Sequence, residues 1–267
     1  MNISDTNLCP IAGKSRPSKM RKTIAITGKG GTGKTVLSTL MIKLLAERGN
    51  LKVLAVDADS AKSLPYTLGM MVGKTVGGIR QDIIENPEEK RRVADTHIGT
   101  VIREILEPGK GFDLLVMGRP EAPGCFCVVN DLLRYGIETL AQDYDITIID
   151  GEAGPEQVNR RVIQSIDTLL VVADTSIRSL QTARDIMKVA QSHGIVKVNK
   201  SGLIINKFKG NRDRVEEVMQ QMDLKIWGYI PEDENVTHYD SLGRPLLDLP
   251  EDSPSFLAIP QILRQIC

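Results

Sequence analysis

The sequence lacks net charge, because 34 lysine and arginine residues balance 34 aspartate and glutamate residues. A balanced chain does not carry the strongly basic surface of a nucleic-acid binder or a polybasic membrane anchor, so we expect neither partner. No apolar run reaches transmembrane length, and the first residues lack the hydrophobic core of a signal peptide. These absences predict a cytoplasmic protein.

Cysteine and histidine are scarce. Four cysteines in a chain without an export signal argue against a disulfide-stabilised scaffold. The three histidines, His97, His193 and His238, are scattered, and none stands at ligand spacing from another. We therefore expect surface or hydrogen-bonded histidines, not metal ligands.

Residues 1–22 are polar and end in a basic cluster. We expect a poorly anchored N-terminal extension followed by one domain over 23–267, a length sufficient for a large α/β core. A transit peptide is the alternative, but Asp5 and Pro10 would interrupt its helix.

Near-continuous apolar runs recur along the chain and are typical of strands buried on both faces. They cover 23–27, 52–57, 113–118, 146–150, 168–173 and 202–206, with a late strand at 225–229. Helical patterns lie between them at 35–48, 127–142, 155–165, 176–193 and 211–222. This alternation predicts an α/β fold: a doubly wound, mostly parallel sheet with helices on both faces and ligands at the carboxyl ends of the strands. The segment 60–112 is weakly patterned, and we expect it to move.

Residues 28–35 read GKGGTGKT, which fits a phosphate-binding loop between a strand and a helix. The candidate phosphate-binding residues are Gly28, Gly30, Gly31, Thr32, Gly33, Lys34 and Thr35. Glycines allow backbone amides to surround phosphate oxygens, and the following helix directs its positive end at them. Lys34 can reach the terminal phosphates, and the Thr35 hydroxyl suits Mg²⁺. The motif predicts binding of a nucleoside triphosphate.

Acidic residues follow two of the predicted strands, where the phosphates should lie. Asp57 and Asp59 follow the strand at 52–57, and Asp150 to Gly154 follows the strand at 146–150. Hydrolysis needs a carboxylate near Mg²⁺ and a polar group that orients the attacking water. A single aspartate at a strand end is as often only a helix cap, but the nearby phosphate loop favours the catalytic interpretation.

Lys29, directly after the first glycine, marks the resemblance to the deviant P-loop ATPases. That group includes the nitrogenase iron protein, MinD and ParA, and its members form dimers in which this lysine reaches the partner's phosphates. The resemblance implies a homodimer with Lys29 and Lys34 as catalytic residues. It also implies that Asp57 holds Mg²⁺, that Asp59 positions the water, and that Gly154 binds the γ-phosphate. A solvated loop lysine is the alternative for Lys29.

The same resemblance implies a base-binding site. In MinD-like ATPases an asparagine bonds the adenine and a proline segment packs on its face; the matching residues are Asn206, with Lys207 beside it, and Pro231. An amide both donates and accepts, which suits a base edge. An asparagine in a turn after a strand is the alternative.

Cys125 and Cys127 are one residue apart. Such a pair rarely forms a disulfide and cannot complete a four-ligand metal site by itself. Two pairs facing each other across a dimer would supply four thiolates, which suits Zn²⁺, Ni²⁺ or an iron–sulfur cluster. Two buried structural cysteines are the alternative.

The segment GRPEAPGCFC, residues 118–127, together with DGEAG at 150–154, resembles the CooC-type ATPases. That family inserts nickel into carbon monoxide dehydrogenase or, in a relative, acetyl-CoA synthase. The resemblance implies an ATP- and Mg²⁺-dependent metallochaperone that binds Ni²⁺ or Zn²⁺ through Cys125 and Cys127 and serves such a client enzyme. A MinD/ParA-like positioning ATPase and an iron–sulfur ATPase are the alternatives. The apolar segment 257–266 is broken by Pro260, so we do not expect a membrane-targeting helix.

Overall fold

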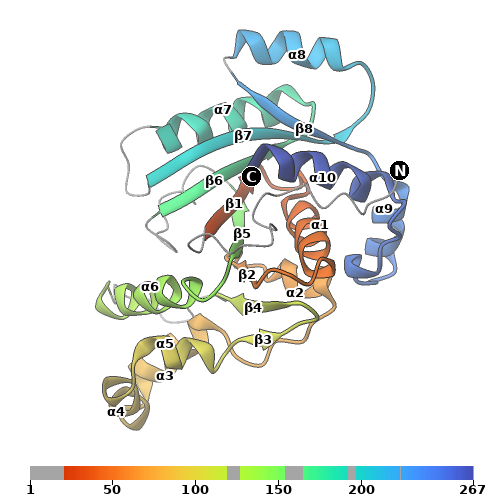
Figure 1. The fold of residues 1–267 in the computed structure, drawn as a ribbon. Coiled ribbons are helices and arrows are strands. Elements are labelled where there is room, and N and C mark those ends of the chain that lie inside the picture. Colours follow the sequence, from red (N-terminus) through yellow and green to blue (C-terminus); the bar gives the residue numbers. More distant parts are fainter. Residues whose placement is uncertain (1–20, 119–126, 154–164, 192–196, 223, 267) are drawn as a thin grey trace.

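The computed structural model describes residues 21–118, 127–153, 165–191, 197–222 and 224–266. An eight-stranded sheet has the order β3-β4-β2-β5-β1-β6-β7-β8, from β3 at the bottom of Figure 1 to β8 at the top. The strands are Lys22–Gly28 (β1), Val53–Asp57 (β2), Glu107–Pro108 (β3), Phe112–Val116 (β4), Ile146–Ala153 (β5), Ser165–Ala173 (β6), Lys197–Phe208 (β7) and Ile226–Pro231 (β8). All neighbours pair in parallel except β3 with β4. The predicted fold class is confirmed.

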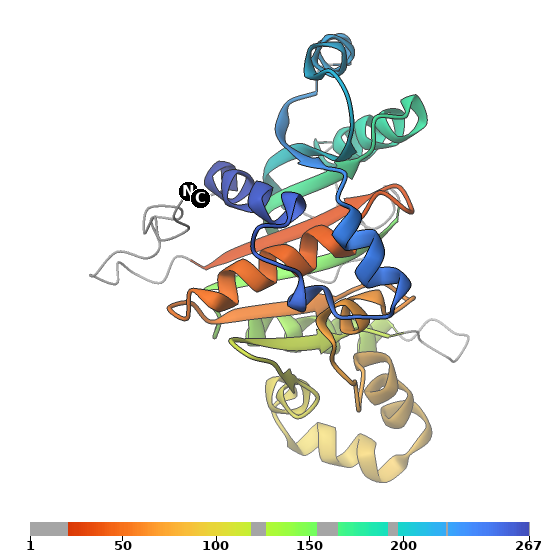
Figure 2. The same ribbon diagram turned by 90° about the vertical axis from the view of Figure 1, so that its right-hand side faces the viewer.

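Helices cover both faces of the sheet (Figures 1 and 2). They are Lys34–Glu47 (α1), Ser63–Leu68 (α2), Val76–Glu85 (α3), Pro87–Asp95 (α4), Ile98–Arg103 (α5), Cys127–Ala141 (α6), Ile177–Gln191 (α7), Arg212–Gln221 (α8), Glu234–Ser241 (α9) and Pro254–Ile266 (α10), with a 3-10 turn at Leu246–Asp248 (η3). Two hydrophobic cores result, one with α1, α2, α9, η3 and α10 and the other with α3 to α8. Alternate residues of β1 face opposite cores. Ile24 and Ile26 lie in the core that contains α1, and Ala25 lies in the core that contains α3 to α8.

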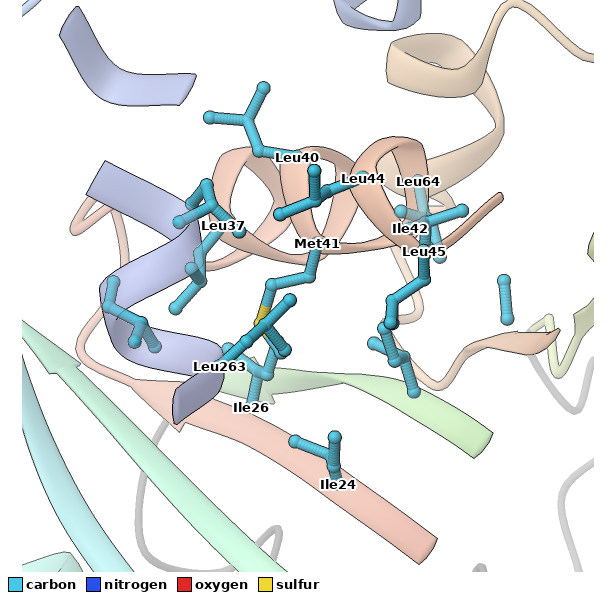
Figure 3. Packing of buried hydrophobic residues seen from close by; sticks show 14 of the residues in the cluster. Ile24, Ile26, Leu37, Leu40, Met41, Ile42, Leu44, Leu45, Leu64 and Leu263 are labelled. Atoms are coloured by element: carbon cyan, nitrogen blue, oxygen red, sulfur yellow. The ribbon is translucent and has the colours of Figure 1, made fainter. Parts of the chain in front are cut away.

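Helix α1 is held tightly against the sheet. Figure 3 shows Met41 extending from α1 toward Ile26 of β1 and Leu263 of α10, and all three are fully buried. Each fully buried side chain of this size contributes about 1.5–3 kcal/mol. Because α1 begins where the phosphate loop ends, this packing fixes the loop's position relative to β1.

All seven predicted strands are confirmed, with boundaries shifted by a few residues. The helices predicted at 35–48, 127–142, 176–193 and 211–222 correspond to α1, α6, α7 and α8. The helix predicted at 155–165 lies outside the described residues, except for Ser165, which begins β6.

Lys22 is the first residue of β1, one residue before the start of the predicted strand. Its Nζ donates to the Ile266 carbonyl at 3.0 Å, which ties β1 to the end of α10. The weakly patterned segment 60–112 contains α2 to α5 and β3. Its motion and the limits of the domain stay predictions.

The prediction that Pro260 breaks the last apolar segment is wrong, since α10 continues through it. An interior proline costs about 3 kcal/mol. Helix α10 buries Phe256, Ile259 and Ile262 in the core it shares with α1, which outweighs that cost. Within the described residues, no helix is both long and apolar enough to cross a bilayer.

Candidate nucleotide and magnesium site

The phosphate loop occupies the turn between β1 and α1, as the motif predicts. Gly33 precedes α1 with a left-handed backbone (φ 89°), and no side chain of the described residues caps the helix there. The first turn of α1 also carries no acidic residue. The free amides and the positive helix end therefore favour an anion at this point.

Two glycines of the loop have no room for a side chain. A Cβ on Gly28 would lie 2.2 Å from the Val172 carbonyl oxygen of β6, and one on Gly33 would lie 2.1 Å from Asn206 Nδ2. Gly31 also has a positive φ (79°), but a Cβ there would meet nothing within 4 Å. The loop is thus packed at its ends and open at its middle, where phosphate would bind.

Gly28→Ala should destabilise the nucleotide-free protein far more than Gly31→Ala. Gly31→Ala adds only the strain of a left-handed alanine, about 1 kcal/mol, whereas Gly28→Ala also forces β1 and β6 apart and should cost about 3 kcal/mol or more. Urea unfolding of both variants measures the difference. Equal losses would contradict the packing of β1 described above.

Asp150 lies in the carboxyl-terminal half of β5 and is fully buried. Its two oxygens accept hydrogen bonds from Thr35 Oγ1 and Ser38 Oγ, each at 2.8 Å. Burial raises the pKa of Asp150 to about 6, against the opposing effect of these hydrogen bonds and of the Lys34 charge. Ser38 is a partner that the sequence motif did not reveal.

Asp57 lies beside Asp150, since the two residues are in register on β2 and β5. Its oxygens accept the backbone amides of Asp59 at 2.9 Å and Leu64 at 3.2 Å. Burial raises the pKa of Asp57 to about 7; these amides oppose the rise, and the negative charge of Asp150 adds to it. Two buried carboxylates therefore lie on adjacent strands, and one of them, Asp150, accepts a hydrogen bond from the Thr35 hydroxyl.

This set of donors fits a hydrated Mg²⁺ ion. Mg²⁺ prefers hard oxygen ligands and is usually held by one or two carboxylates or hydroxyls together with phosphate oxygens. Asp57, Asp150 and Thr35 supply such oxygens beside the phosphate loop. A divalent cation would also offset the cost of burying two negative charges side by side.

The raised pKa values predict how stability depends on pH. Asp57 and Asp150 bind protons more tightly in the folded state than at their ordinary value of 3.8, so the folded state loses stability as pH rises from about 4 to about 7. Relative to Asp57→Asn, the nucleotide-free wild type should lose about 2–4 kcal/mol of unfolding free energy between pH 4 and pH 8. Urea unfolding at several pH values measures this. If the difference in unfolding free energy between wild type and Asp57→Asn did not change with pH, this prediction would be contradicted.

Asp59 follows β2, and Lys29 is the second residue of the phosphate loop. Asp59 is half-buried, and its Oδ1 accepts the Ala61 amide at 2.9 Å. The Lys29 side chain is half-buried, while its carbonyl accepts the Thr32 hydroxyl at 2.8 Å. The catalytic roles assigned to Asp59, Lys29 and Lys34 stay predictions.

Asn206 and Lys207 reach the phosphate loop from the end of β7. Asn206 Nδ2 donates to the Thr32 carbonyl at 2.7 Å, and Lys207 Nζ donates to the Gly31 carbonyl at 3.0 Å. Lys207 adopts a left-handed backbone (φ 52°), which turns its side chain toward the loop. Pro231 ends β8 and pairs with Phe208. Contact of these residues with a base stays a prediction.

The predicted metal ligands fall at the edge of the described structure. Cys125 lies outside the described residues, and Cys127 is the first residue of α6 but its side chain is not described. Gly154, the predicted γ-phosphate contact, also lies outside the described residues. Among the described side chains, no group of three or more histidine, cysteine or acidic residues could hold a metal ion. The paired-cysteine site is therefore untested.

The fold and the phosphate loop agree with a comparison to known families. Residues 23–246 match the CobQ/CobB/MinD/ParA nucleotide binding domain. The chain belongs to this family. It is 40% identical to an uncharacterized ATP-binding protein of Methanocaldococcus jannaschii, over 91% of this chain and 97% of that protein.

More distant relatives in the MinD/ParA family have assigned functions. The chain is 29% identical to the carbon monoxide dehydrogenase accessory protein CooC of Rhodospirillum rubrum, over 85% of this chain and 89% of that protein. It also shares its fold with the septum site-determining protein MinD of Pyrococcus horikoshii, solved with Mg-ADP, at a TM-score of 0.66 and 21% identity over 91% of this chain and 94% of that one. The chain is thus an ATP-binding protein of the MinD/ParA type.

Proposed function

We propose that the protein is an ATP-hydrolysing metallochaperone that acts as a homodimer. ATP and Mg²⁺ bind at the phosphate loop and close two subunits, so that Lys29 of each approaches the partner's phosphates. The closure brings Cys125 and Cys127 of both chains together to hold one Ni²⁺ or Zn²⁺ ion. Hydrolysis relaxes the loops and delivers nickel to carbon monoxide dehydrogenase or acetyl-CoA synthase.

One observation carries the hydrolytic part of this proposal: Asp57 and Asp150, both buried, lie in register, and Asp150 accepts the Thr35 hydroxyl. These residues would hold Mg²⁺, which would neutralise charge developing on the transferred phosphoryl group. Asp59 follows within two residues and can orient the attacking water. The Mg-ADP bound to the related MinD structure supports the same choice of cation and nucleotide.

Two independent features support the metal-delivery part. The similarity to the CooC accessory protein extends over most of the chain. Cys127 is the first residue of α6, and α6 leads into β5, which carries Asp150. A change at the nucleotide can therefore reach the cysteines through one helix.

The client is tested by activating nickel-free enzyme. We expect nickel-free carbon monoxide dehydrogenase or acetyl-CoA synthase to gain activity with the protein, Ni²⁺, Mg²⁺ and ATP, and far less with a non-hydrolysable ATP analogue. If both enzymes gain equal activity with and without the protein, the delivery function is wrong.

A further inference from the structure

A side-chain hydrogen bond connects the loop after β2 to the end of β5. Ser60 Oγ donates to Glu152 Oε1 at 3.0 Å, and both residues are half-buried. Ser60 directly follows Asp59, and Glu152 comes two residues after Asp150. The bond thus joins the segment that carries the proposed water-positioning carboxylate to the segment that carries the buried magnesium-site carboxylate.

The Glu152 end of this bond is anchored to β1. Thr27 Oγ1 donates to the Glu152 carbonyl at 3.3 Å, one residue before the phosphate loop begins. The preceding residue, Gly151, packs so closely on β1 that a Cβ there would lie 2.8 Å from the Ile26 carbonyl oxygen. Glu152 therefore keeps a fixed position relative to the phosphate loop.

The Ser60 end belongs to a tight turn around Asp59. The Asp59 amide donates to Asp57, and Asp59 accepts the amides of Ala61 and Lys62 through its side chain and carbonyl. Lys62 has a left-handed backbone (φ 54°), which costs about 1–2 kcal/mol for a residue with a side chain. The bond from Ser60 to Glu152 adds a contact that holds this turn from outside it.

We infer that Ser60 and Glu152 are positioning residues for ATP hydrolysis. Their charge-assisted hydrogen bond fixes the turn so that the Asp59 carboxylate stays at the correct place to orient the attacking water. The Ser60–Glu152 bond lies outside residues 28–35, so we expect its loss to lower kcat more than nucleotide affinity. This inference rests on the proposed ATPase function and adds two residues to its machinery.

The test is a set of ATPase measurements on single and double variants. Ser60→Ala and Glu152→Ala should each lower kcat about tenfold with KM unchanged, because each removes a hydrogen bond to a charged group. The double variant should be no slower than either single variant, since both changes break the same bond. Ser60→Thr keeps the hydroxyl and should retain most of the activity. Ser63→Ala, at the first residue of α2 and three residues after Ser60, serves as the matched control and should leave kcat unchanged.

Each other outcome overturns the inference. A kcat of Ser60→Ala within twofold of wild type, or above it, means that the bond does not position Asp59. A raised KM at unchanged kcat would place the pair in nucleotide binding instead, and additive effects of the two single changes would show that they act separately. If wild type hydrolysed no ATP, the proposed function would be overturned as well. If wild type were active and Ser60→Ala had the same kcat, only this inference would be overturned.

Discussion

Lys34→Ala should lower kcat for ATP hydrolysis by at least about 10³-fold and weaken ATP binding, because this position supplies the charge that stabilises the transferred phosphoryl group. Lys34 begins α1, is only 8% exposed, and lies close enough to Asp150 for its charge to lower the pKa of that carboxyl. Its positive charge is therefore held at the phosphate loop between the helix end and the magnesium-site carboxylates. A steady-state assay together with a nucleotide-binding titration measures both effects.

Lys188→Ala is the matched control for Lys34→Ala. Lys188 is an exposed lysine of α7, so its loss removes one positive charge without removing a phosphate ligand. We expect hydrolysis by this variant to stay within about threefold of wild type, as for a screened surface charge. If Lys34→Ala also stayed within this range, the assignment of the phosphate loop would be wrong.

The double variant Cys125→Ser/Cys127→Ser should bind no Ni²⁺ or Zn²⁺ while binding ATP as well as wild type does. Serine hydroxyls do not replace thiolates as ligands for these borderline-soft ions, and loss of two ligands per chain leaves a shared four-thiolate site without any. The phosphate loop is built by β1, α1 and β7, which these substitutions do not touch. Anaerobic equilibrium dialysis with metal analysis, alongside an ATP titration, separates the two activities.

The chain provides its own control for this experiment. Its other two cysteines, Cys9 and Cys267, can be changed to serine together. That variant should keep the full metal content. If the Cys125→Ser/Cys127→Ser variant kept its metal and the Cys9→Ser/Cys267→Ser variant lost its metal, the metal site would have to be assigned to Cys9 and Cys267.

The sheet could be predicted from sequence because its strands are buried on both faces. Runs such as Ile146 to Ile149 contain little but aliphatic and β-branched residues, so their type and order follow from composition alone. Helices α2 to α5 were not predicted, because they are short and carry glycines such as Gly77 and Gly99. For α4 the start was nonetheless encoded: Asn86 caps it, Pro87 is its first residue, and Glu88 and Glu89 fill its first turn.

The site residues that belong to a local motif could be predicted from the sequence. The residues whose hydrogen-bond partners lie far along the chain could not. The loop 28–35 and the carboxylates at the ends of β2 and β5 follow from their positions after strands. The bonds of Ser38 to Asp150 and of Ser60 to Glu152 span 112 and 92 residues, and no spacing rule connects such pairs. The parallel pairing of β5 with β2 brings Ser60 to Glu152, and its pairing with β1, which leads into α1, brings Ser38 to Asp150.

We propose that nucleotide-driven dimerisation assembles a metal site between two chains. An anaerobic Ni²⁺ and Zn²⁺ titration of wild type followed by sizing, with and without ATP and Mg²⁺, tests this. We expect a dimer with ATP and Mg²⁺ that binds about one metal ion per two chains, as four shared thiolates require. Dimerisation with ATP but no specific metal binding would contradict it and would leave a MinD-like switch as the function.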